Sequence, residues 1–148
     1  MKTISRFGWH IIEKYRKLRY NDDRIVRVGI RMKWSYDSWD GDGKIKICQR
    51  GMHASQTPAD AYRCVNGGFN LDGAWLCRVL VDGSGYGDRF SRSRGHMGGG
   101  KFVGTHRTVL GMVRLHDVMT PDVFISDEAI LELMRKRNRK NGVKTEVR

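Results

Sequence analysis

The chain has 148 residues and a formal net charge of +12. This length is usual for one domain and is enough to bury a core without metal or disulfide crosslinks. It has no signal-like apolar start and no run near the roughly 18 apolar residues of a membrane span, so we expect a cytoplasmic protein without membrane contact. Three cysteines without C-x-x-C spacing favour reduced thiols and exclude a recognisable zinc motif.

The positive charge is concentrated at the two ends of the chain. Residues 1–31 hold nine Lys/Arg and three acids, residues 135–148 hold seven and one, and residues 32–134 hold twelve of each. We therefore predict one domain over residues 1–134, a basic tail over 135–148, and nucleic acid as the partner, the alternative being solvated basic ends. The candidate nucleic-acid contacts are Arg135, Lys136, Arg137, Arg139, Lys140, Lys14, Arg16, Lys17 and Arg19.

In the first third of the chain, aromatic and β-branched residues predict strands over residues 7–12 and 25–30. Residues 37–43, reading DSWDGDG, are typical of a turn and lack the later ligands of a calcium loop. The alternation over residues 44–48 predicts a half-buried strand.

From residue 57 onward the signals are stronger. Thr57, Pro58 and Asp60 predict a capped helix over 58–65, and Ser126 predicts a second over about 127–139. Strands are expected over 74–81, ending at Asp82, and over 101–115; residues 83–100, with seven glycines, are expected to form a long loop. The pattern predicts a single α+β domain with a mixed or antiparallel sheet and two or three helices.

Two of the five histidines are candidate functional residues. His10 and His53 lie in or at the end of predicted strands, and His53 precedes small residues and a helix start, an arrangement suited to anion or nucleotide binding. We predict that His10, His53, Ser55 and Tyr62 converge on one concave site. The alternative is that both histidines are hydrogen-bonded structural residues.

Short motifs spread over residues 8–120 give a first resemblance. They are GWH at 8–10, LRY at 18–20, GMHAS at 51–55, DAY at 60–62, CRV at 77–79 and RTVL at 107–110. In this order they resemble a family of small phage and prophage proteins with a G-[LM]-H-A-S core. The resemblance implies a phage or mobile-element origin, hence a host cytoplasm and a host protein as a further candidate partner, but no activity.

The order of segments also resembles the ADP-ribosyltransferase fold. His10 stands at its first-strand position, and residues 51–55 stand at its G-[IL]-Y-F-[AST] strand, with His53 in place of Tyr. The resemblance implies an ADP-ribosyltransferase-like fold, with NAD as cofactor and no metal. The cofactor-binding residues that it implies are His10, Arg50, His53, Ser55 and Tyr62.

The chain departs from that family in one respect, because the strand over 101–115 carries no Glu to polarise the ribose. It carries His106 and Arg107 instead, as in the related RNA 2′-phosphotransferases, which use Arg and His. The resemblance therefore implies His53, His10 and Arg107 as catalytic residues. The alternative is that the chain retains the ADP-ribosyltransferase fold and has lost the ADP-ribosyl transfer activity.

Three functions follow as hypotheses. The first is a phage ADP-ribosyltransferase-like protein that binds NAD or a related nucleotide and acts near nucleic acid. The alternative is a non-enzymatic basic phage protein that binds DNA, RNA or a host factor. A metal-independent nuclease built on two histidines and Lys101 is the third. Residues 98–101, reading GGGK, are not a P-loop because Phe102 follows the lysine.

Overall fold

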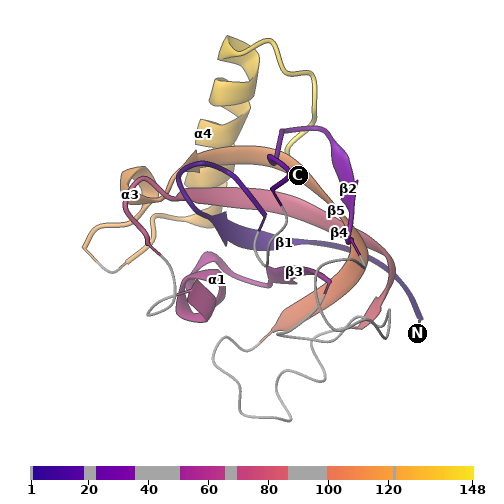
Figure 1. The fold of residues 1–148 in the computed structure, drawn as a ribbon. Coiled ribbons are helices and arrows are strands. Elements are labelled where there is room, and N and C mark those ends of the chain that lie inside the picture. Colours follow the sequence, from indigo (N-terminus) through magenta and orange to yellow (C-terminus); the bar gives the residue numbers. More distant parts are fainter. Residues whose placement is uncertain (1, 19–22, 36–50, 66–69, 87–99, 122) are drawn as a thin grey trace.

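The computed structural model describes residues 2–18, 23–35, 51–65, 70–86, 100–121 and 123–148. They form a single-domain α+β fold with an antiparallel sheet, as predicted (Figure 1). The strands are β1 (Lys2–Ile12), β2 (Arg31–Lys33), β3 (Met52–Ser55), β4 (Trp75–Tyr86) and β5 (Lys101–Arg114). The helices are α1 (Pro58–Val65), α3 (Leu115–Val118) and α4 (Asp127–Lys140). No helix in these ranges is long and apolar enough to cross a membrane.

Four of the strands form a closed circuit of pairings. β1 pairs with β4 from Lys2 opposite Gly85 to Ile12 opposite Trp75, and β4 pairs in turn with β5. The first residues of β5 pair with β3, and β3 returns to β1 through Trp9 opposite Ser55. β2 adds to β5 beside residues 106–108. The sheet therefore has an inner and an outer face.

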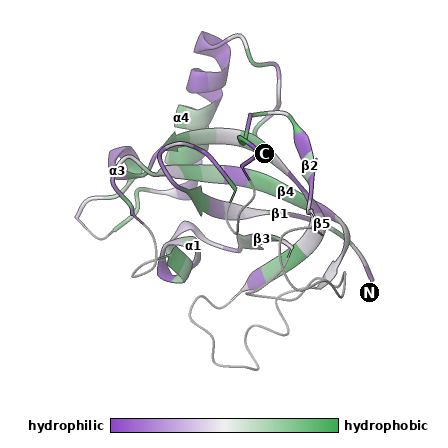
Figure 2. Ribbon diagram, viewed as in Figure 1, coloured by the Kyte–Doolittle hydropathy of each residue, from purple (hydrophilic) through white to green (hydrophobic). Residues whose placement is uncertain are grey.

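The outer face is covered by the helices. Its core contains Trp9, Leu76 and Val113 of the sheet together with Ala61 of α1 and Met134 of α4. Figure 2 shows that the part of α4 near the sheet is apolar and that its hydrophilic C-terminal end projects away. Ser126 accepts a hydrogen bond from the Ala129 amide and caps α4, and Thr57 accepts one from the Asp60 amide at the start of α1, as predicted.

The inner face carries a second core. Ile4, Cys77, Val79 and Phe102 belong to it, and Val26 from the segment after β1 is buried against it. Gly8 permits the close approach of β1 to this core, because a Cβ there would overlap the Phe102 ring and lie 2.9 Å from the Ser55 carbonyl oxygen. A side chain at position 8 would therefore push β1 and β3 apart.

Three strand predictions differ from the structure. β1 begins at Lys2, five residues before the predicted start at residue 7. Residues 25–30 are not a strand: Ile25 makes one isolated bridge to Lys17, and Gly29, at φ 85°, lies in a turn before β2. β4 continues past Asp82 to Tyr86, because a bulge between Asp82 and Gly85 keeps it paired with β5. The predicted turn over 37–43, the strand over 44–48 and residues 87–99 of the predicted loop lie outside the described residues.

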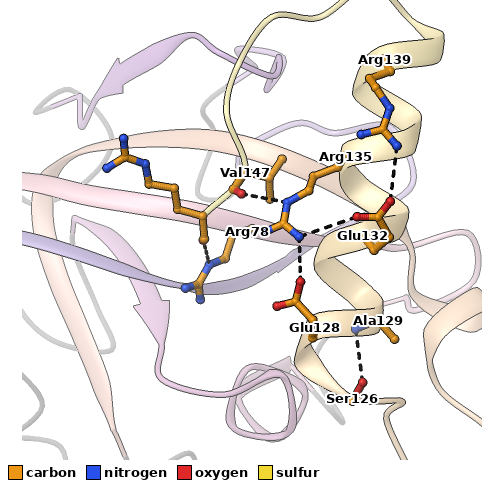
Figure 3. Close-up of polar contacts among 9 residues, drawn as sticks. Arg78, Ser126, Glu128, Ala129, Glu132, Arg135, Arg139 and Val147 are labelled. Atoms are coloured by element: carbon orange, nitrogen blue, oxygen red, sulfur yellow. Dashed lines mark hydrogen bonds and ion pairs between the residues drawn. The ribbon is translucent and has the colours of Figure 1, made fainter.

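Residues 135–148 are integrated into the domain. α4 continues through the expected boundary to Lys140, and Val147, only 4% exposed, belongs to the outer core. The buried Asn138 amide donates hydrogen bonds to the carbonyls of Leu110 (2.9 Å) and Thr145 (3.2 Å). Arg78 and Arg135 hold the carbonyls of the last two residues, at 2.7 and 3.2 Å (Figure 3). The basic C-terminal residues therefore do not form a separable tail.

Candidate functional site

The sheet separates the two candidate histidines. Directly opposite residues in antiparallel strands point to the same face, so Ser55 shares the outer face with Trp9. Side chains alternate along a strand, so His53 also points outward. His10 follows Trp9 and lies opposite Cys77 of the inner core, so it points inward. The expected convergence of His10 and His53 is therefore not found.

The other members of the expected site pack with the outer core. The Ser55 Oγ lies 3.9 Å from the Cys64 Sγ of α1. The Tyr62 ring contacts Phe124 edge-on, with ring centroids 6.2 Å apart. Arg50 lies outside the described residues. Ser55 and Tyr62 thus contribute to the packing of α1 on the outer face and are separated from His10 by the sheet.

Arg107 is a charged residue enclosed by the inner face. It is 6% exposed and lies opposite Val81 of β4 and Met32 of β2, both packed in the inner core. One guanidinium nitrogen donates a 2.8 Å hydrogen bond to the main-chain carbonyl of His53. Arg107 and His53 are therefore brought together, but through the backbone of His53 and not through its ring.

The charge of Arg107 has no acidic partner among the described residues. Burial lowers the pKa of the guanidinium to about 10, so it stays protonated at neutral pH. The titratable group that acts on it is the Cys77 thiol, and burial raises the pKa of that thiol to about 12, so Cys77 is uncharged. A buried cation without a counter-charge is costly, on the order of several kcal/mol.

Two further basic side chains share the inner face. Arg6 also lies opposite Val81, so Arg6, Val81 and Arg107 form one row across three strands. The Arg6 guanidinium lies 4.6 Å from the centroid of the Phe102 ring. Arg6 and His10 are both half-buried. We call Arg6, His10 and Arg107 the inner basic cluster.

Chemically, the inner basic cluster is suited to an anion. Guanidinium groups bind phosphate or carboxylate oxygens through paired N–H donors, and such charge-assisted hydrogen bonds are stronger where water is partly excluded. The missed member is Arg6. A strand longer than the predicted 7–12 would have revealed it, because Arg6 lies two residues from both Ile4 and Gly8 and so shares the inner face with them.

His106 is adjacent to Arg107 but does not join the cluster. It lies opposite Asp82 of β4 and Lys33 of β2, and its Nδ1 is 2.8 Å from the Thr105 hydroxyl. Burial, and then the nearby positive charge of Arg31, lower its pKa, so the imidazole is neutral at pH 7. Its position beside the Arg31–Asp82 ion pair (3.0 Å) indicates a structural role.

The basic residues expected to contact nucleic acid fall into two groups. Arg135 and Arg139 form ion pairs with Glu128 and Glu132 on α4, at 2.8 and 3.4 Å (Figure 3). Arg19 lies outside the described residues. The remaining candidates form no ion pair with any residue that the structure describes: Lys14, Arg16, Lys17, Lys136, Arg137 and Lys140.

Comparison of the chain with protein-family models, with curated proteins and with solved structures finds no match. Within the described ranges, no group of three or more His, Cys, Asp or Glu side chains is placed to hold a metal ion.

Proposed function

We propose that the protein binds a phosphorylated ligand at the inner basic cluster, with NAD or a related nucleotide as the first candidate. The observation that carries the proposal is the buried charge of Arg107, which has no acidic partner among the described residues. A bound phosphate supplies that negative charge and accepts hydrogen bonds from the guanidinium nitrogens.

The arrangement of the cluster favours a ligand with two adjacent phosphates. Arg6 and Arg107 are separated by one intervening strand, which places their Cα atoms about 10 Å apart at the usual strand spacing. Two long side chains from these positions can reach neighbouring phosphates of a dinucleotide. The separation of His10 and His53 by the sheet removes the NAD cradle that the resemblance to ADP-ribosyltransferases implies, so NAD enters here as a ligand with two adjacent phosphates. ADP-ribosyl transfer near nucleic acid is the activity to test.

Within this proposal the predicted catalytic residues take different roles. Arg107 stabilises negative charge on the ligand, and the His53 carbonyl orients Arg107. His10 is the imidazole on the ligand's side of the sheet, where it can donate or accept a proton. The ring of His53 lies on the outer face and takes no part.

The test is a ligand series measured by calorimetry and ligand-observed NMR. NAD, ADP-ribose and pyrophosphate are expected to bind, whereas nicotinamide and adenosine, which lack phosphate, are not. Release of nicotinamide from NAD is then followed with and without RNA or DNA. Binding without release assigns a nucleotide-binding protein that lacks the transfer, and the same affinity for adenosine as for ADP-ribose contradicts the phosphate site.

Two alanine variants distinguish the faces of the sheet. His10→Ala is expected to weaken ADP-ribose binding about tenfold, the usual effect of losing one hydrogen bond to a charged group. His53→Ala removes the same chemical group from the outer face and keeps the carbonyl that holds Arg107, so affinity should stay within about twofold, as for other changes outside a site. Calorimetry and thermal unfolding are measured on both variants. Equal losses of affinity would show that the ring of His53 contacts the ligand.

A further inference from the structure

A second group of cations gathers where β1 ends, around Trp75. The Trp75 Nε1 donates a 3.2 Å hydrogen bond to the Lys14 carbonyl. Arg114 donates a 2.5 Å hydrogen bond to the Gly73 carbonyl, and the side chain of Lys14 lies against Gly73. The guanidinium carbons of Arg114 and Arg137 lie 3.7 and 4.7 Å from the centroid of the Trp75 ring. We call Lys14, Arg114 and Arg137 the Trp75 cluster.

The positive charge of the Trp75 cluster meets no acidic partner in the part of the chain that the structure describes. None of its three members forms an ion pair with any residue in the described ranges. Arg139, on the same helix as Arg137, is instead paired with Glu132. Cation–π contacts with Trp75 hold two guanidinium groups in place, which reduces the side-chain entropy lost when an anion binds.

An exposed aromatic side chain lies beside one of these cations, Lys14. Tyr15 is 74% exposed, and the Lys14 ammonium lies 5.6 Å from the centroid of its ring. Cations beside an accessible aromatic ring are the usual composition of surfaces for single-stranded nucleic acid, where phosphates contact the cations and an unstacked base stacks on the ring. A duplex offers no such base.

We propose that the Trp75 cluster and Tyr15 bind single-stranded nucleic acid, with the phosphates on Lys14, Arg114 and Arg137 and one base on Tyr15. The surface uses no residue of the inner basic cluster, so it does not depend on nucleotide binding there. Lys14 follows β1, Arg114 ends β5, and Arg137 lies in α4, so none of the three cations belongs to a separate C-terminal tail.

The test compares two arginines of α4 that differ in their partners. Each of Arg137→Gln and Arg139→Gln removes one positive charge from the same helix. With a fluorescent single-stranded oligonucleotide, Arg137→Gln should weaken binding about tenfold and reduce the slope of log affinity against log salt by about 0.7. Arg139→Gln should stay within about twofold, because it removes only an exposed ion pair. Anisotropy titrations at several salt concentrations give both quantities.

Substitutions at Tyr15 form the second part of the binding test. Tyr15→Ala should weaken binding about tenfold without changing the salt slope, and Tyr15→Phe should retain the affinity because it keeps the stacking ring. Equal losses for Arg137→Gln and Arg139→Gln would overturn the proposal by showing non-specific attraction. A Tyr15→Ala variant with full affinity, a duplex bound as tightly as the single strand, or polyglutamate competing equally would also overturn it, the last result pointing to an acidic protein partner.

Discussion

Arg107→Met is expected to abolish phosphate-dependent ligand binding and to leave the fold at least as stable as the wild type. The lowering of the guanidinium pKa from its ordinary value to about 10 corresponds to roughly 3 kcal/mol of unfavourable burial of the charge. The folded pKa is below the unfolded one, so this penalty is present in full at pH 7 and decreases only as the pH rises above about 10. Met fills a similar volume without the charge, and the lost hydrogen bond to His53 costs only about 1 kcal/mol.

Two measurements separate a binding role for Arg107 from a structural one. Urea unfolding gives the free energy of unfolding, and calorimetry with ADP-ribose or pyrophosphate gives the affinity, which should fall at least about a hundredfold for a lost charge-assisted pair. A structural arginine would show the opposite result: a destabilised variant with unchanged ligand affinity. Arg6→Met is the matched control on the same row, and because Arg6 is only half-buried, its loss should weaken binding with little change in stability.

Deletion of residues 143–148 is expected to lower the free energy of unfolding by about 3 kcal/mol or more. Burial of the Val147 side chain alone contributes about 1.5–3 kcal/mol. The deletion also removes the Thr145 carbonyl from the buried Asn138 amide, and the last two carbonyls from Arg78 and Arg135. Chemical denaturation of the truncated chain gives the change in stability.

Two point substitutions, Val147→Ala and Lys144→Gln, separate the contributions of apolar burial and of charge to the stability lost in the deletion. Val147→Ala removes buried methyl groups and should lower the free energy of unfolding by about 1–2 kcal/mol, whereas Lys144, an exposed residue, should contribute within about 0.5 kcal/mol. A truncated chain as stable as the full one would contradict the packing of this segment. If the deletion destabilises the domain, its loss of nucleic-acid affinity cannot be assigned to charge, so the point substitutions at Arg137 and Arg139 are the sounder test.

Features determined by neighbouring residues could be predicted from the sequence. The helix over 58–65 and the helix starting at 127 follow from Thr57, Pro58 and Ser126, because a cap acts within one turn. The strands near 75 and 101 follow from long apolar runs. The segment over 25–30 was mispredicted because its apolar residues suit a strand, but Gly29 adopts a left-handed conformation in a turn.

The composition of the site could be predicted only in part, because the face of the sheet to which a side chain points depends on the register of the strand pairing. His10 and Arg107 were expected in one site and do share the inner face, although no pattern near either residue fixes its orientation. His53 was assigned to the same site, but the pairing of Trp9 with Ser55 turns its side chain outward. That pairing joins segments more than forty residues apart, and so no local sequence signal specifies it.

The closed circuit of strands has a consequence for how the chain reaches this structure. β1 precedes its long partner β4 by more than sixty residues, β4 ends at Tyr86, and the circuit cannot close until β5 has followed. Pairings over such sequence distances form slowly, because the entropy cost of closing a long loop comes before any stabilising contact between the strands. In the interval β1 and β4 present unpaired apolar edges, the usual starting point for aggregation. Expression at low temperature, which weakens hydrophobic association between such edges, is therefore expected to raise the yield of soluble protein.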